Sequence, residues 1–231
     1  MLSKNQLKQL ELFQDIAPQT AERILEKGKV TKVSKGTILM RSKEPAHQIL
    51  IQLSGKSIIY NLTHVGKRKI LFIFGRGALL NDHISNDNMP SVYCETIDES
   101  TILSIPASEF MKMMSEDFIL MKNIIEAQEK KIWRLSHQLK NTMSSIYLER
   151  KLASKRWKLG RDFGVQTEDG LEINMNLSIT FLADMLGVPR ETTSRVCAEL
   201  VDYGLIKVNK KRITILDSNK MSAFYKTGKI E

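Results

Sequence analysis

Residues 182–206, "LADMLGVPRETTSRVCAELVDYGLI", contain two short amphipathic segments separated by a glycine. Gly187 favours the left-handed backbone that ends a helix, and Pro189 favours the first turn of the next helix. The apolar residues on each side have the spacing of one helix face; they are Leu182, Met185 and Leu186, then Val196, Leu200 and Val201. Two short helices joined by a tight glycine turn predict a helix-turn-helix.

The second of these helices is polar on one side near its start. Arg190, Glu191, Ser194 and Arg195 fall on adjoining turns of one face. An arginine can donate two hydrogen bonds to guanine, and a glutamate can accept one from cytosine. Since DNA phosphates repel a carboxylate, Glu191 favours base reading over simple charge attraction. The alternative is that Glu191 only pairs with Arg195 at the four-residue spacing.

The composition is that of a globular protein of one or two domains, with 231 residues, 42% hydrophobic and 26% charged. No apolar run is long enough to span a bilayer, and "MLSKNQLKQLELF" predicts a helix start, not a signal peptide. We therefore expect a cytoplasmic protein with no membrane partner.

A formal net charge of +9 favours a polyanionic partner such as double-stranded DNA. The segment "LERKLASKRWKLGR" gathers six basic residues, namely Arg150, Lys151, Lys155, Arg156, Lys158 and Arg161. These residues form either a solvated helix face or a surface near DNA phosphates, and the sequence leaves both interpretations open.

Cysteine usage limits the chemistry of the chain. Cys94 and Cys197 are its two cysteines, which excludes an iron–sulfur cluster and a disulfide framework. Both thiols are predicted to be inert, small core residues in a reducing compartment. The sequence has no metal-ligand cluster, nucleophile–base pairing or phosphate loop, so we expect neither a metal site nor an enzyme.

The pattern along the chain predicts an α+β protein in three parts. Residues 1–115 begin with a helix at about Ser3–Lys27 and continue as short β-branched or aromatic segments, which predicts a jelly-roll barrel. The expected strands lie within residues 35–42, 48–63, 67–74, 91–97 and 100–106. His64–Lys67 is predicted to form a hairpin turn.

Residues 116–146 carry a seven-residue apolar repeat. Its members are Phe118, Ile125, Ile132, Leu139 and Ile146. A heptad repeat of this length predicts a coiled coil between two copies of the chain. The alternative is a helix that packs on its own barrel, which does not need a seven-residue repeat. Ser144 and Ser145 are poor helix formers and suggest a hinge before the next helix.

Residues 147–231 hold the basic helix, an expected strand pair within "LEINMNLS" and the helix-turn-helix. The segment "GLIKVNKKRITILD" then predicts two strands around Asn209, Lys210 and Lys211. A hairpin after a helix-turn-helix makes a winged domain.

The order of barrel, long helix and winged motif, together with "RETTSRV" after Leu-Gly-Val, resembles the Crp/Fnr family of bacterial transcription regulators. The resemblance implies a cyclic-nucleotide-binding-like barrel, a homodimer and a pseudo-palindromic operator, with RNA polymerase as a partner if the protein is an activator. It also implies that Glu191 and Arg195 read a shared TGA-like part of the half-site. Arg190 matches the catabolite-activator branch, whereas Ser194 matches the oxygen-sensor branch. Residues assigned to phosphates are Thr192, Asn209, Lys210 and Lys211.

Relatives that bind cyclic AMP use a Gly-Glu pair and an Arg-Ser pair, where this chain has Asn81-Asp82 and Pro90-Ser91. Pro90 supplies neither a charge nor an amide hydrogen, and Asp82 adds a negative charge. Cyclic AMP is therefore disfavoured. Haem is disfavoured but not excluded, because the chain's histidines offer no dependable axial ligand. They are His47, His64 in the predicted hairpin turn, His83 in an exposed polar loop, and His137.

Another small effector could bind between the barrel and the long helix. Residues expected there are Asp82, Ser91, Gln128, Trp133, Ser136 and His137. By resemblance, Ser136 and His137 occupy the place that reaches adenine in cyclic-AMP relatives. The sequence also allows a dimer that needs no effector, and it leaves activator and repressor open. An alternative function is an effector-binding module that acts on a protein partner, which the winged motif argues against.

Overall fold

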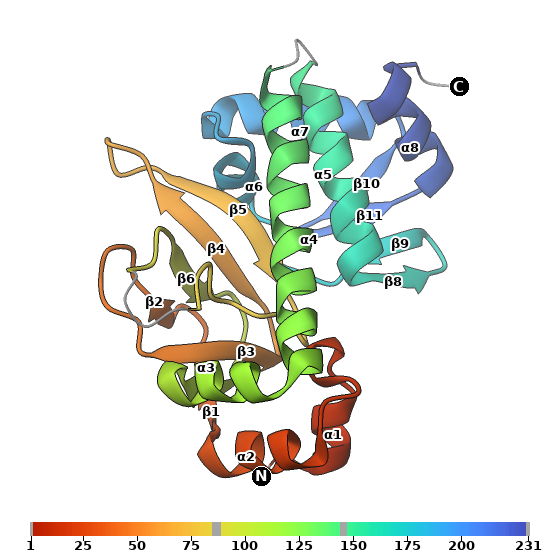
Figure 1. The fold of residues 1–231 in the computed structure, drawn as a ribbon. Coiled ribbons are helices and arrows are strands. Elements are labelled where there is room, and N and C mark those ends of the chain that lie inside the picture. Colours follow the sequence, from red (N-terminus) through yellow and green to blue (C-terminus); the bar gives the residue numbers. More distant parts are fainter. Residues whose placement is uncertain (1, 85–88, 144–146, 230–231) are drawn as a thin grey trace. The chain divides into compact units, whose positions relative to one another are not determined.

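The computed structural model of the chain describes residues 2–84, 89–143 and 147–229, and it divides into two compact units, Met1–Ser136 and His137–Glu231 (Figure 1). Ser144, Ser145 and Ile146, which include the predicted hinge and the last member of the heptad repeat, lie outside the described residues. Within the described ranges, the helices are too short or too polar to cross a membrane.

The first unit begins with short helical segments where the sequence predicted one continuous helix over residues 3–27. They are α1 (Lys4–Lys8), the 3-10 turn η1 (Glu11–Phe13) and α2 (Pro18–Lys27). The single-helix prediction is wrong because Pro18 lacks the N–H that an uninterrupted helix would use, and it instead begins α2. Asp15, three residues before Pro18, has a positive φ of 59°, which is not a right-handed helical conformation.

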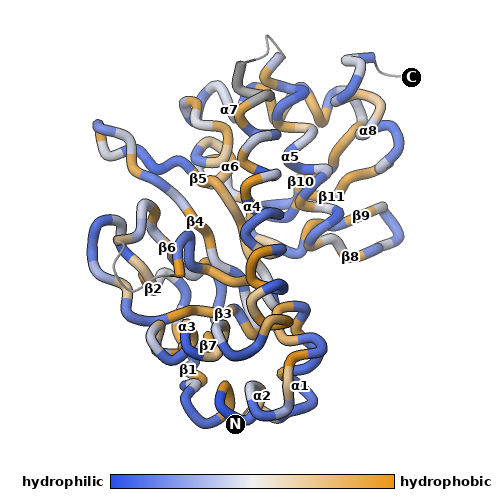
Figure 2. Tube along the Cα trace, in the orientation of Figure 1, coloured by the Kyte–Doolittle hydropathy of each residue, from blue (hydrophilic) through white to orange (hydrophobic). Residues whose placement is uncertain are grey.

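The described strands of the first unit form two antiparallel sheets. One has the order β1 (Lys29–Val33), β7 (Ser100–Pro106), β3 (Gln48–Ser54); the other has the order β2 (Ile38–Met40), β6 (Tyr93–Thr96), β4 (Ser57–Leu62), β5 (Arg68–Phe74). The predicted hairpin turn is confirmed, since Leu62 of β4 pairs with Arg68 of β5. In Figure 2 hydrophobic stretches lie along these strands, while the β4–β5 loop is largely hydrophilic. Strand β1 was not predicted, because it is mostly exposed and lacks apolar alternation.

Neighbouring residues of β7 connect the two cores of the first unit. Ile102 packs with Ile59 and Phe72 of the other sheet, so one core lies between the sheets. Leu103, the next residue, points to the opposite face and joins the core that contains the helices. The helices therefore cover the outer face of the β1–β7–β3 sheet.

The long helix begins later than predicted and follows a separate helix. Helix α3 (Ala107–Glu116) was not predicted, and α4 (Phe118–Met143) follows it after Asp117. The Asp117 carboxylate accepts hydrogen bonds from the backbone N–H of Ile119 at 3.0 Å and of Leu120 at 3.2 Å. It therefore caps α4 and separates the two helices.

Helix α4 has two apolar faces with different surroundings. Leu120 and Ile124 are buried in the core of the first unit. The heptad residues instead face outward, with exposed fractions of 69% for Phe118, 49% for Ile125 and 62% for Ile132. One face of α4 therefore packs on the barrel of its own chain, the heptad residues with a described side chain are exposed, and the coiled coil stays a prediction.

The second unit is a winged helix-turn-helix, as predicted. Its helices are α5 (Leu148–Phe163), α6 (Ile179–Leu186), α7 (Arg190–Asp202) and α8 (Ser218–Thr227); its sheet has the order β10 (Ile206–Asn209), β11 (Arg212–Ile215), β9 (Gly170–Ile173), β8 (Gly164–Thr167). The strand pair predicted within residues 171–178 lies earlier, because residues 174–178 lead into α6, which the Ser178 hydroxyl caps. Helix α8 was not predicted.

Two of the six basic residues of α5 are engaged within the second unit, and the two interpretations of the other four stay open. Arg156 is completely buried, with an exposed fraction of 0%. Arg150 donates a hydrogen bond from Nε to the carbonyl of Tyr225 at 3.2 Å and another to the carbonyl of Lys226. Arg156 is therefore not part of a solvated face, whereas Arg150 is partly buried and binds carbonyl groups at the end of α8.

Candidate nucleic-acid interface and sensor site

The turn of the helix-turn-helix depends on the backbone of Gly187. Its φ of 76° lies in the left-handed region, and its N–H donates to the carbonyl of Ala183 at 2.7 Å. Pro189 stands at the N-cap of α7 and not in its first turn, where the sequence placed it. Its carbonyl accepts hydrogen bonds from the N–H and the hydroxyl of Thr193. These contacts fix the direction in which α7 starts.

Helix α7 separates a buried side from an exposed one. Thr193, Val196, Cys197 and Leu200 are buried against the rest of the unit. The predicted base-reading side chains lie on the exposed side, where they line an open hollow of about 420 Å³; they are Arg190, Glu191, Ser194 and Arg195. Val201, predicted to belong to the buried face, is 42% exposed and does not.

The ion pair on this exposed side is not the one considered from the sequence. Arg195 pairs with Glu199, with 3.1 Å between Nη1 and Oε1. No ion pair of Glu191 is found among the residues that the structure describes. An exposed pair of this kind contributes little to stability, so both groups can turn to another partner. Arg190 and Glu191 therefore present opposite charges side by side at the start of α7.

The wing turn lies between β10 and β11. Asn209, Lys210 and Lys211 are all exposed, and Lys210 has a positive φ of 56°. The carbonyl of Lys211 accepts a hydrogen bond from the N–H of Leu177 at 2.8 Å, which ties the turn to the segment before α6. Thr192, the remaining predicted phosphate contact, is half-buried on α7.

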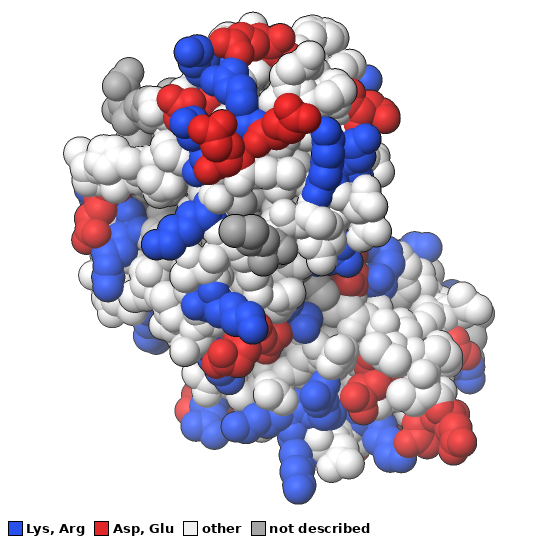
Figure 3. Space-filling model, turned by 90° about the horizontal axis from the view of Figure 1, so that it is seen from below, with Lys and Arg blue, Asp and Glu red and all other residues white. Residues whose placement is uncertain are grey.

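The net positive charge of the chain does not give every face a basic surface. On the face seen in Figure 3, basic and acidic side chains are intermixed among the residues drawn in colour. The candidate DNA contacts are the polar side chains of α7 and the wing residues.

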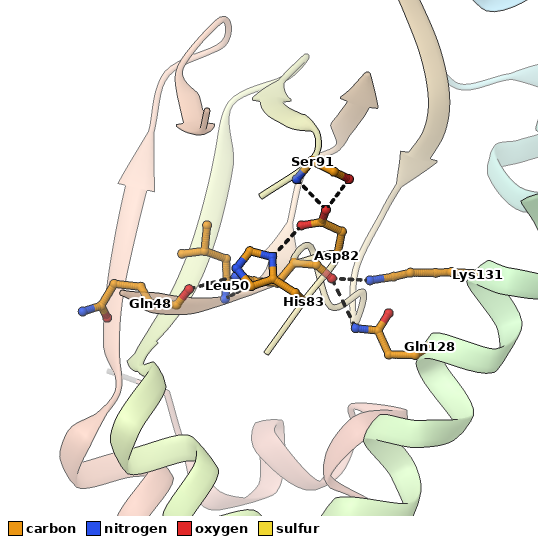
Figure 4. Close-up of polar contacts among 8 residues, drawn as sticks. Gln48, Leu50, Asp82, His83, Ser91, Gln128 and Lys131 are labelled. Carbon is orange, nitrogen blue, oxygen red and sulfur yellow. Dashed lines mark hydrogen bonds and ion pairs between the residues drawn. The ribbon is translucent and has the colours of Figure 1, made fainter. Parts of the chain in front are cut away.

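In the first unit, Asp82, His83 and Ser91 lie in a polar cluster near Gln128 and Lys131 of α4 (Figure 4). Asn81 connects this cluster to β3. Its side chain is buried; Oδ1 accepts from the N–H of Leu50 at 2.7 Å, and Nδ2 donates to the carbonyl of Gln48 at 2.9 Å. These two hydrogen bonds hold Asn81 against β3. Asn81, which stands where cyclic-AMP relatives have the glycine of their Gly-Glu pair, therefore stabilises the fold of the barrel.

Asp82 and Ser91 lie together, as predicted for the effector pocket, and they bind each other. The Asp82 carboxylate accepts from the Ser91 N–H at 2.9 Å and from its hydroxyl at 2.7 Å, and it lies 3.0 Å from Nδ1 of His83. Burial raises the pKa of Asp82, but the hydrogen bonds from Ser91 and His83 outweigh it and keep that pKa below its usual value. His83 is largely buried, with 16% of its side chain exposed, so the prediction of an exposed histidine is wrong.

Lys131 of α4 belongs to this cluster, although sequence reasoning missed it. Its Nζ donates to the carbonyl of Asn81 at 2.6 Å and lies 5.4 Å from the centre of the Phe74 ring. Gln128 reaches the same carbonyl at 3.5 Å. The signal was present, because Lys131 follows Leu120 and Ile124 on the barrel-facing side of α4. Burial lowers the pKa of Lys131 to about 8, against a smaller opposing effect of Asp82.

The remaining residues predicted for the effector pocket lie in the later turns of α4. Trp133 is 61% exposed, and Ser136 donates to the carbonyl of Ile132 within its own helix. His137 is exposed and belongs to the second unit. Within residues 2–84, 89–143 and 147–229, no group of three or more metal-ligating side chains is found.

Replacement of Lys131 should change how stability depends on pH. Above about pH 8 the folded protein loses the Lys131 proton, whereas the unfolded chain keeps it up to the ordinary lysine pKa of 10.5. The unfolded state then binds more protons, so the wild type gains stability as pH rises across this window. Lys131→Met removes this gain, which we expect to be on the order of 2 kcal/mol.

Urea unfolding of both proteins from about pH 7 to about pH 10 measures this difference. Lys112→Met, at an exposed lysine of α3, is the control. If the stability difference between wild type and Lys131→Met stays constant over this range, Lys131 is not a buried ammonium.

Two family models match the chain. A cyclic nucleotide-binding domain matches residues 30–117, and a Crp-like helix-turn-helix domain matches residues 150–224. Among curated proteins, the chain is 29% identical over 202 residues to the probable transcriptional regulator flp of Lacticaseibacillus casei, which covers 84% of this chain and 85% of that protein.

Solved structures share the fold. A putative transcriptional regulator of the Crp/Fnr family from Eubacterium rectale has a TM-score of 0.74 at 20% identity, covering 94% of this chain and 98% of that one. A CooA mutant from Carboxydothermus hydrogenoformans has a TM-score of 0.74 at 20% identity, covering 88% of this chain and 90% of that one. The α+β fold class and the winged helix-turn-helix predicted from the sequence are confirmed.

Proposed function

This chain belongs to the Crp/Fnr family of transcription regulators, and from that premise we propose that two copies bind one pseudo-palindromic DNA operator. In this proposal residues 1–115 form the sensor domain, residues 116–146 the dimerisation helix and hinge, and residues 147–231 the DNA-binding domain. The protein would act in the cytoplasm on double-stranded DNA, with RNA polymerase as a further partner if it is an activator.

The observation that carries this proposal is the exposed side of α7. Two arginines, a carboxylate and a hydroxyl surround one open hollow at the start of a helix whose other side is buried. Arg190 and Arg195 can donate to guanine, and Glu191 can accept from cytosine, so α7 can discriminate between bases in a major groove. Thr192 and the wing residues are assigned to phosphates.

The uncovered heptad face of α4 supports the dimer. The exposed fraction of each heptad residue with a described side chain is 49% or more; these residues are Phe118, Ile125, Ile132 and Leu139. A second α4 packed on this face would bury them. Two recognition helices would then enter successive major grooves on one side of the duplex, about one helical turn apart.

Selection of bound sequences from a random DNA pool tests the proposal. We expect an inverted repeat whose half-sites are centred about 10 base pairs, or one helical turn, apart. A single half-site without a repeat would contradict the dimeric part of the proposal. Recovery of no preferred sequence would contradict base reading and favour a module that acts on a protein partner.

The wing lysines should contribute affinity without specificity. Lys210→Ala and Lys211→Ala are each expected to weaken binding to the operator and to unrelated DNA by the same factor. Each should also reduce the slope of log affinity against log salt concentration by about one, the value of one phosphate contact. Fluorescence anisotropy at several salt concentrations measures both quantities. Lys32→Ala, at an exposed lysine of β1, should change neither. A change in sequence preference would show that the wing reads bases.

We further propose that a small effector acts on Asn81, Asp82 and Ser91 and on α4. Asp82 already engages both hydrogen-bond donors of Ser91 and brings a negative charge to that place. A cyclic phosphate would have to displace this carboxylate, so the site disfavours cyclic AMP. Because Lys131 and Gln128 bind the Asn81 carbonyl, movement of Asn81 would reach α4 and the dimer contact directly.

A further inference from the structure

The acidic partner of Arg195 lies on the recognition helix itself. Glu199 follows Arg195 by four residues, about one turn of α7, and 3.1 Å separates its Oε1 from Nη1 of Arg195. The side chain of Glu199 is 30% exposed, whereas that of Arg195 is 70% exposed. The carboxylate is therefore the more firmly packed member of the pair, and it determines where the guanidinium rests.

Helix stability does not explain why a glutamate stands at this place. A carboxylate one turn after its basic partner is the less favourable order of the two. Glu199 also lies in the last turn of α7, where the helix macrodipole disfavours negative charge. A pair at the surface adds little to stability in any case. The placement of Glu199 is better explained by its effect on Arg195.

Arg190 and Arg195 line the same hollow but differ in charge balance. In the described part of the chain no ion pair of Arg190 is found, whereas Glu199 balances the charge of Arg195. An unbalanced arginine is attracted by every DNA phosphate, which strengthens binding to all sequences alike. A balanced arginine gains much less from a phosphate, yet its remaining N–H groups can still donate to the O6 and N7 atoms of guanine.

We propose that Glu199 is a positioning residue that makes Arg195 selective for base edges over phosphates. To reach a phosphate, Arg195 would have to leave Glu199 and present an unpaired carboxylate to the negatively charged DNA backbone. To donate to guanine in the major groove, Arg195 can keep the Glu199 contact, and the exclusion of water there strengthens that contact. Glu199 therefore weakens binding to unrelated DNA more than binding to the operator. This inference rests on the proposed function of α7.

Glu199→Gln tests this role because glutamine keeps the shape of the side chain and removes its charge. Fluorescence anisotropy at several salt concentrations measures the affinity for the selected operator and for unrelated DNA. We expect the affinity for unrelated DNA to rise about fivefold and the operator affinity to rise less, so that discrimination falls. The slope of log affinity against log salt concentration for unrelated DNA should steepen by about one, the value of one phosphate contact. Unchanged discrimination would overturn the proposal.

Two further variants separate this role from a general effect of charge. Asp202→Asn removes the same charge from an exposed side chain in the same turn of α7, and it should leave discrimination unchanged. In an Arg195→Ala background, which retains Arg190 and Glu191, Glu199→Gln should no longer lower discrimination. An equal loss with and without Arg195 would show that Glu199 does not act through Arg195. Thermal unfolding checks that each variant folds.

The same measurements distinguish failure of this inference from failure of the proposed function. If the wild type prefers the operator and Glu199→Gln prefers it equally, Glu199 has no positioning role, while base reading by α7 stands. If the wild type binds the operator and unrelated DNA alike, the proposed function fails, and the role of Glu199 fails with it.

Discussion

Replacement of Glu191 and Arg195 together by alanine is expected to reduce discrimination between the selected operator and scrambled DNA by at least about 100-fold. Each of these side chains can make a base contact that distinguishes right from wrong bases by about 1–3 kcal/mol. Both are exposed, and the pair of Arg195 with Glu199 lies at the surface, so the fold should survive the change. Competition binding with labelled operator measures the ratio.

The control removes the same types of charge elsewhere in the DNA-binding unit. Asp202→Ala and Lys220→Ala together also delete one acidic and one basic exposed side chain, at the end of α7 and in α8. This variant should keep the preference for the operator. Full discrimination by the Glu191→Ala/Arg195→Ala protein would show that α7 does not read bases through these residues.

Ile132→Asp is expected to convert the dimer into a monomer and to weaken operator binding by at least about 100-fold. Ile132 is 62% exposed in the single chain and lies in the middle of the heptad repeat. In a coiled coil it would face its counterpart, where two buried carboxylates would lose hydration and repel each other. Sedimentation velocity measures the mass, and anisotropy measures the affinity.

Trp133→Asp is the matched control for this change. Trp133 is the next residue of α4 and is equally exposed, at 61%, but it stands outside the seven-residue repeat. Its replacement should leave the protein dimeric. If Ile132→Asp stays dimeric, or if both variants dissociate alike, the heptad face is not the contact between the two copies.

Elements with strong local signals could be predicted from the sequence. The turn at Gly187 requires a left-handed backbone, and β5 and β7 are rich in β-branched or aromatic residues. Elements without such signals were missed: β1 is mostly exposed, and α3 was taken as part of the barrel. The long N-terminal helix was predicted in spite of Pro18, whose missing N–H should have argued for a break.

The polar side of α7 could be anticipated because amphipathic spacing reports which face is exposed. The contacts of Lys131 and Arg156 could not be anticipated in the same way, although Lys131 shares the barrel-facing side of α4 with Leu120 and Ile124. Each lies in a helix rich in lysine and arginine, and only the packing of distant segments buries one basic residue and leaves the next in water. The bonds of Asp82 to Ser91 depend likewise on a loop closure that periodicity does not encode.

The central claim is that two chains occupy one operator through paired recognition helices. Sedimentation of the protein with a labelled duplex carrying both half-sites measures the stoichiometry directly, and a second duplex with about 5 extra base pairs between the half-sites places them on opposite faces of the DNA. We expect two chains on the first duplex and a large loss of affinity for the second. One chain per duplex, or equal affinity for both duplexes, would contradict this claim.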